Sequence, residues 1–115
     1  MNSGAGDLNE FARQCLDDCY TWFPTMANET AERQIVHFTL GMAGEVGEVV
    51  ELIKKWHGGR PGYNIEDREL LGRIAEEICD VLQYVGDLAF FLDLDLDRAM
   101  DAKRAANAER FGRLA

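Results

Sequence analysis

The sequence is poor in the residues that build zinc sites, disulfide frameworks and membrane spans. It has only two histidines, His37 and His57, and three cysteines, Cys15, Cys19 and Cys79. A zinc site would need Cys and His ligands at tight spacings, and His37 and His57 are the only histidines. The odd number of cysteines, all in apolar helix-patterned stretches, predicts buried free thiols. The apolar runs are only a few residues long, which excludes a bilayer-spanning helix.

Positive charge is also scarce. Twelve Lys and Arg residues face 21 Asp and Glu residues, which gives a net charge of −9. This balance disfavours nucleic acid and anionic membranes as partners. The first eleven residues lack the basic and apolar regions of a secretory signal, so we expect a cytoplasmic protein. At this length we expect a single domain over residues 1–115, with its core at about 30–111.

What the sequence has in abundance is helical periodicity. Apolar residues recur at three- and four-residue steps in four stretches, and no alternating strand pattern competes with them. The stretches cover about residues 8–22, 30–56, 67–92 and 95–111. Pro24 closes the first, a glycine- and proline-rich linker follows the second, and Asp95 is a good N-cap for the last. We therefore predict an all-α fold, a four-helix bundle that assembles as an oligomer.

The second and third stretches each carry a predicted core stripe. The stripe positions are Met42, Val46, Val49, Ile53 and Trp56, and then Ile74, Ile78, Val81, Val85, Leu88 and Leu92. Such spacing is typical of a helix that buries one face. Gly41, Gly44 and Gly47 each cost the second helix about 1 kcal/mol relative to alanine. Close approach of another helix or of a ligand would explain them equally well.

An acidic pair lies beside each core stripe, and we predict that the pairs form a metal site. Antiparallel packing of the two helices would bring Glu45, Glu48, Glu77 and Asp80 together. Clustered carboxylates repel one another, so they either stay apart in solvent or bind cations between them. All-oxygen ligation suits Mg²⁺, with Mn²⁺ as a substitute.

The fourth stretch supplies the opposite charge. Lys103, Asn107 and Arg110 share one helical stripe whose two ends are apolar. The stripe is either a set of snorkelling side chains at the edge of a bundle or a patch that faces phosphate.

These motifs, taken in order, resemble the MazG-like pyrophosphohydrolases. Residues 44–51 (GEVGEVVE) and 77–84 (EICDVLQY) are similar to the paired ExxE…ExxD signature of that family. Lys103, Asn107 and Arg110, followed by Phe111, are similar to its closing K-x-x-x-N-x-x-R-[YF] helix. The resemblance covers about residues 37–111 and is strongest to the dCTP pyrophosphatase and phage MazG-like branches.

The resemblance implies Mg²⁺-dependent hydrolysis of a nucleoside triphosphate, a pyrimidine or non-standard deoxynucleotide, to the monophosphate and pyrophosphate. It implies catalytic roles for Glu45 and Glu48, with Glu48 as the base. Substrate-binding roles fall on Lys103, Asn107, Arg110, Tyr84, His37 and Trp56, with Trp22 as a further aromatic candidate for the wall of a base pocket. The aromatic candidates among them are equally compatible with a place in the core. The resemblance also implies a homodimer or homotetramer.

Two other functions fit parts of the pattern. A ferritin-like di-iron bundle needs Glu-x-x-His on two helices, and neither histidine stands three residues after a glutamate. A non-enzymatic acidic interaction module is the stronger alternative. It predicts acids spread around the helices, whereas the two pairs here share a shoulder of the core.

Overall fold

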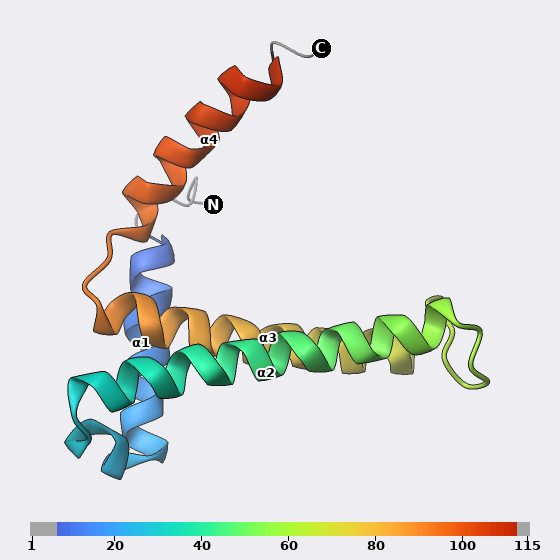
Figure 1. Cartoon of the computed structure of the whole chain (residues 1–115), viewed down its shortest axis with the longest axis horizontal. Coiled ribbons are helices and arrows are strands. Elements are labelled where there is room, and N and C mark those ends of the chain that lie inside the picture. Colours follow the sequence, from blue (N-terminus) through green and yellow to red (C-terminus); the bar gives the residue numbers. More distant parts are fainter. Residues whose placement is uncertain (1–6, 113–115) are drawn as a thin grey trace.

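The computed structural model describes residues 7–112, which form four α-helices and one short 3₁₀ helix (Figure 1). In chain order these are α1 (Asp7–Trp22), the 3₁₀ helix Pro24–Asn28, α2 (Ala31–His57), α3 (Arg68–Phe91) and α4 (Leu96–Gly112). The described residues contain no strand, so the all-α class and the four predicted helices are confirmed. None of the described helices combines the length and apolar content needed to cross a membrane.

Side-chain caps fix where three of the helices begin. The Thr30 hydroxyl accepts a hydrogen bond from the backbone N–H of Arg33 at 3.2 Å. Asp67 accepts one from the backbone N–H two residues ahead at 3.0 Å, and Asp95 from the N–H three residues ahead at 3.1 Å. Each cap pairs a donor that the first turn of a helix leaves without a partner. The helix starts therefore follow from local sequence chemistry.

Helices α2 and α3 form an antiparallel hairpin joined by the loop 58–67, and α1 packs across α3 near the other end of the hairpin (Figure 1). The buried core lies at this crossing and is built on Leu16 and Cys19 of α1 and Phe38 of α2. Contact is close because Gly86 of α3 has no side chain, and a Cβ there would lie 2.5 Å from Cys15 Sγ. Residues of α1 thus belong to the core together with residues within 30–111.

The predicted core stripes of α2 and α3 are wrong near their middle, whereas Leu88 of the α3 stripe packs against the core as predicted. Val46 and Ile78, from the middle of the two stripes, are each 44% exposed, whereas Phe38 and Leu52 on the neighbouring stripe are buried. Each helix is therefore rotated so that its acidic shoulder faces the other helix. The middle residues of both stripes line, with two neighbouring residues, an apolar groove of about 240 Å³, which is formed by Val46, Val49, Val50, Ile78, Val81 and Leu82. No further helix of the described chain covers this outer apolar groove (Figure 1).

Helix α4 is attached to α1 at one end and projects away from the hairpin (Figure 1). Asp97 accepts hydrogen bonds from the backbone N–H groups of Leu8 and Asn9 at 3.1 and 3.3 Å. The Asn9 side chain in turn accepts one from the Leu96 N–H at 2.7 Å. No described residue of α4 is buried. The hairpin, α1 and α4 therefore do not close into one bundle within a single chain, because the polar middle of α4 offers little apolar surface to bury.

The prediction for the cysteines is confirmed at two of the three positions. Cys15 and Cys19 are buried free thiols at the crossing of α1 and α3. Burial is the main cause that raises the pKa of each thiol to about 11. Cys79 is free but exposed, since it shares a face of α3 with Gln83 and Gly86, which contact Cys15 of α1, but lies one turn before them.

Candidate active site

Three of the four predicted metal ligands meet between α2 and α3. Glu45 comes from α2, and Glu77 and Asp80 come from successive turns of α3. One carboxylate oxygen of each lies within 4.8 Å of those of the other two. Glu45 and Glu77 are half-buried and Asp80 is exposed. The antiparallel hairpin thus brings the acids of the two helices together.

The crowding of these acids raises the pKa of Glu45. The largest cause is a hydrogen bond shared with Glu77, followed by partial burial and by the negative charges of Asp80, Glu77 and Glu48. Such a cluster is unfavourable unless one member is protonated or a cation lies between them. Because every donor is a carboxylate oxygen, the cluster fits a hard divalent ion such as Mg²⁺ or Mn²⁺.

Glu48 stands at the edge of this arrangement. It is exposed, it lies one turn of α2 beyond Glu45, and it is not among the residues whose oxygens converge. Its charge nevertheless contributes to the raised pKa of Glu45. The structure therefore places Glu48 beside the three-carboxylate cluster, with its side chain accessible to water.

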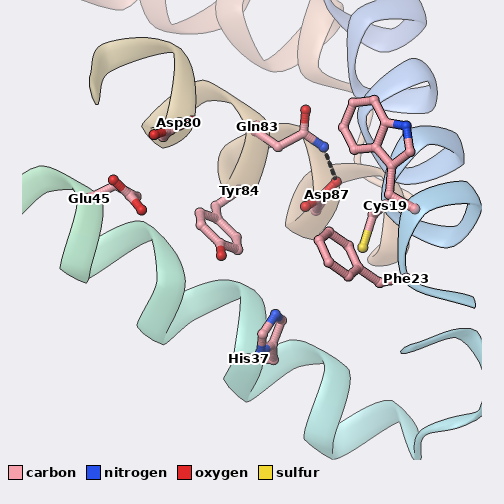
Figure 2. A pocket seen from close by; sticks show the side chains of 9 residues that line it. Cys19, Phe23, His37, Glu45, Asp80, Gln83, Tyr84 and Asp87 are labelled. Atoms are coloured by element: carbon pink, nitrogen blue, oxygen red, sulfur yellow. Dashed lines mark hydrogen bonds between the residues drawn. The ribbon is translucent and has the colours of Figure 1, made fainter. Parts of the chain in front are cut away.

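A cavity of about 330 Å³ opens beside the cluster (Figure 2). Its walls are formed by Cys19, Trp22, Phe23, His37, Glu45, Asp80, Gln83, Tyr84 and Asp87. Figure 2 shows Glu45 and Asp80 at one end, Phe23 and Asp87 at the other, and Tyr84 between them. The cavity thus has an acidic end and an aromatic end. No Lys or Arg is among the described residues that line it.

The aromatic end contains a buried carboxyl group. Asp87 is only 2% exposed, and burial is the main cause that raises its pKa to about 7. Gln83 Nε2 donates a hydrogen bond to Asp87 Oδ1 at 3.0 Å and another to the Cys15 carbonyl oxygen at 2.8 Å. The Gln83 bond favours the ionised form and offsets part of the effect of burial, whereas the charge of Asp18 adds to it.

Of the six predicted substrate-binding residues two line the cavity, and so does Trp22, the further candidate for a base pocket. Tyr84 and His37 both contribute to the wall, and their rings meet edge to face with centroids 6.0 Å apart. Trp56 lies eleven residues beyond Glu45 on α2, which is about 16 Å along the helix. Its ring is instead near that of His57, at the loop end of the hairpin. The structure thus separates Trp56 from the cavity of its own chain.

The predicted phosphate-binding residues are also separated from the cavity within one chain. Lys103, Asn107 and Arg110 lie on α4, which points away from the hairpin (Figure 1). Lys103 and Arg110 are exposed, and the guanidinium of Arg110 lies over the ring of Phe111, 5.1 Å from its centroid. Within one chain these three residues therefore lie away from the cavity.

The sequence reasoning did not select Cys19, Phe23 or Gln83 as site residues. Phe23 directly follows α1 and precedes Pro24, so it resembles a residue that only ends a helix. Gln83 was predictable as a candidate site residue, because it is an amide within the apolar run from Val81 to Val85. A polar residue at such a position often hydrogen-bonds inside a site.

The chain is similar over part of its length to a known protein. dCTP pyrophosphatase 1 from Rattus norvegicus is 35% identical to this chain over 72 residues, which are 63% of this chain and 42% of that protein. The match thus covers less than half the length of the curated relative. No family model and no solved structure matches the chain. The chain is therefore similar in part to a dCTP pyrophosphatase, in agreement with the resemblance seen in its motifs.

Proposed function

We propose that this protein hydrolyses a pyrimidine deoxynucleoside triphosphate, with dCTP as the first candidate, to the monophosphate and pyrophosphate in the presence of Mg²⁺. The observation that carries the proposal is the cavity that joins a three-carboxylate cluster to an aromatic end. A nucleotide has the same two parts, a polyphosphate that needs cations and a flat base that needs a stacking surface. The similarity to dCTP pyrophosphatase 1 supports the same reaction.

Metal binding and proton transfer take place at the acidic end of the cavity, and contact with the nucleoside takes place further along it. Glu45, Glu77 and Asp80 would hold Mg²⁺, which supplies neutralisation of the triphosphate and polarisation of its P–O bonds when bound. Glu48, exposed beside the cluster, accepts the proton of the water that attacks the α-phosphorus. The bond from the α-phosphorus to its bridging oxygen then breaks, and pyrophosphate leaves. Tyr84 contacts the nucleoside between the two ends of the cavity.

The proposal includes assembly into a homodimer or homotetramer. The outer apolar groove exposes valine, isoleucine and leucine side chains along both helices of the hairpin. Exposed apolar patches of this kind are typical of subunit interfaces. Assembly also assigns a role to α4, because Lys103 and Arg110 of one copy could then contact the triphosphate in the site of another copy. Light scattering at several concentrations tests the state of assembly.

A panel of triphosphates tests the reaction. The panel contains the canonical pyrimidine and purine deoxynucleoside triphosphates and the 5-methylated pyrimidine ones. Each is incubated with Mg²⁺, with Mn²⁺ or with a chelator, and pyrophosphate and orthophosphate are measured separately. We expect pyrophosphate from at least one pyrimidine substrate and none with the chelator. Absence of turnover for every member of the panel rejects the enzyme and favours the acidic interaction module.

A pair of adjacent substitutions provides the control. Glu77→Gln removes a carboxylate from the cluster, whereas Glu76→Gln makes the same chemical change at an exposed neighbour. We expect Glu77→Gln to lose at least about 100-fold in kcat/KM and Glu76→Gln to remain near wild type. Glu48→Gln should keep the fold and lose a similar factor, as expected for a general base. Retained activity in Glu48→Gln would remove Glu48 from the mechanism.

A further inference from the structure

The carboxyl of Asp87 has no structural partner that explains its burial. Its side chain is 2% exposed, and among residues 7–112 its one hydrogen bond comes from Gln83, to Oδ1. No basic side chain of the described residues forms an ion pair with it. Burying such a group costs free energy that the fold does not recover elsewhere. No hydrogen bond among the described residues involves the second oxygen, Oδ2, and Asp87 is one of the residues that line the cavity.

Gln83 fixes which oxygen of Asp87 can carry a proton. The Cys15 carbonyl can only accept, so the hydrogen bond of 2.8 Å identifies the nearby Gln83 atom as Nε2. The same nitrogen therefore donates to Asp87 Oδ1 as well. Oδ1 is held as an acceptor, and a proton on this carboxyl resides on Oδ2. The pair thus offers an acceptor and, when the carboxyl is neutral, a donor beside it.

The position of the carboxyl matches the base of a bound nucleotide. Asp87 is seven residues beyond Asp80 on α3, so it lies about 10 Å along the helix from the acidic end. It lies at the aromatic end of the cavity with Phe23, and Tyr84 lies between the two ends (Figure 2). A triphosphate at the acidic end would direct its base towards Asp87. Phe23, 62% exposed, remains free to stack on that base.

We propose that Asp87, oriented by Gln83, hydrogen-bonds the edge of the nucleobase. Asp87 selects bases that carry an amino group beside a ring-nitrogen acceptor, as cytosine does. It disfavours bases with a keto group beside a ring N–H, as in uracil and thymine. The proposal deepens the proposed function and rests on it. The cytosine amino group donates to Oδ1, and Oδ2–H donates to the ring nitrogen N3. Uracil would place its N3–H against Oδ2–H and its O4 against Oδ1, so both contacts would be repulsive.

The burial of Asp87 supports this assignment. In this dry environment the pKa of Asp87 is raised to about 7, so a substantial fraction of the carboxyl is neutral near neutral pH. In the ionised form each base makes one favourable and one repulsive contact, because Oδ2 then faces the lone pair of cytosine N3 but accepts from N3–H of uracil. The neutral form of Asp87 therefore carries the selection for the amino-bearing base.

Substitutions of Asp87 test the assignment. Wild type, Asp87→Asn, Asp87→Ala and the exposed control Asp101→Asn are compared for kcat/KM on dCTP and dUTP. We expect wild type and Asp101→Asn to prefer dCTP by at least about 10-fold, since each lost hydrogen bond costs about 1 to 1.5 kcal/mol. Asp87→Asn keeps an acceptor beside a donor and should retain most of the preference. Asp87→Ala should bring the ratio close to one while dUTP is still hydrolysed.

Gln83 is a positioning residue, and its substitution should change the dCTP:dUTP ratio in a different way from Asp87→Ala. Gln83→Met removes the N–H that holds Oδ1 as an acceptor. The carboxyl can then present its proton on either oxygen and pair with either base. We expect the dCTP:dUTP ratio to fall chiefly through a gain in dUTP hydrolysis, which a general loss of structure would not produce.

A binding measurement separates failure of this inference from failure of the proposed reaction. Calorimetric titration of wild type and Asp87→Ala with dCMP and dUMP reports base selection without turnover. Hydrolysis of triphosphates with a dCTP:dUTP ratio unchanged in Asp87→Ala overturns the role of Asp87 and leaves the reaction standing. Selective dCMP binding that depends on Asp87, without hydrolysis of any triphosphate, supports the base site and rejects the reaction. Equal dCMP and dUMP affinities in wild type overturn the inference.

Discussion

Replacing Asp87 by asparagine should stabilise the protein at pH 8 and leave its stability nearly unchanged at pH 4. Burial raises the pKa of Asp87 from 3.8 to about 7 in the folded protein. Below pH 4 the carboxyl is protonated in both the folded and unfolded states and contributes no difference. Between about pH 4 and pH 7 the unfolded state releases the proton and the folded state retains it, so the free energy of unfolding falls as the pH rises. Above pH 7 both states are ionised and the penalty is constant.

The magnitude follows from the two pKa values. A gap of about three pH units corresponds to about 4 kcal/mol, because each unit is worth 1.36 kcal/mol. Asparagine keeps the oxygen that accepts from Gln83 and carries no charge, so it removes the penalty without removing this contact. We expect Asp87→Asn to exceed wild type by about 2 to 4 kcal/mol at pH 8, once local relaxation is allowed for.

Urea unfolding followed by circular dichroism measures this difference. Wild type and Asp87→Asn are compared at pH 4, 6 and 8 and at one fixed protein concentration, since assembly changes apparent stability. The other acids titrate equally in both proteins and cancel in the comparison. A stability difference that is the same at pH 4 and pH 8 would refute the burial of an uncompensated carboxyl at position 87.

Three further predictions concern packing, metal and assembly. Gly41→Ala should lower the free energy of unfolding by about 1 to 3 kcal/mol, because a Cβ there would lie 2.5 Å from the Tyr84 ring. Gly72→Ala, which has open space around it, should raise that free energy by about 0.5 to 1 kcal/mol. Urea unfolding measures both. Mg²⁺ at about 100 times its Kd should raise Tm by roughly 10 °C through mass action. Glu77→Gln should melt higher than wild type without Mg²⁺, because it relieves repulsion, and should show little Mg²⁺ response. Leu82→Glu, in the outer apolar groove, should lower the mass measured by light scattering to that of one chain, and an unchanged mass would exclude this groove from the interface.

The limits of the helices were predictable because their determinants are local. Thr30, Asp67 and Asp95 cap helices whose starts fall where the sequence places them. The convergence of Glu45 with Glu77 and Asp80 was predictable for a related reason. A linker of about ten residues between two long helices favours an antiparallel hairpin, and helical spacing then sets which turns face each other.

The rotation of the hairpin was not predictable from periodicity alone. Two adjacent stripes of α2 compete to face α3, and the more apolar one, which includes Val46, lies outside. A face that packs against another copy of the chain is as apolar as a core, so composition does not distinguish them. The inward stripe is favoured by a detail of contact, the Tyr84 ring against Gly41, which a helical wheel does not contain.

The direction of α4 also depended on contacts distant in sequence. The hydrogen bond that the Leu96 N–H donates to the Asn9 side chain joins residues 87 positions apart. The turn before α4 contains Asp93 with φ of 55°, a left-handed conformation that asparagine and aspartate adopt more readily than most residues. The buried state of Asp87 was equally hidden, because helical spacing places Asp87 on the same stripe of α3 as Glu77 and Asp80, of which Asp80 is exposed.

The hydrogen bonds between the first turns of α1 and α4 fix α4 near Asp97, which can act as a pivot for the rest of the helix. Arg110 lies thirteen residues beyond this pivot, about 20 Å along the helix axis. A change of about 10° in the pivot angle would therefore sweep Arg110 through about 3 to 4 Å, while residues of the first turn would hardly move. The near end of α4 is held by hydrogen bonds to α1, so a small change in angle there is magnified at the far end.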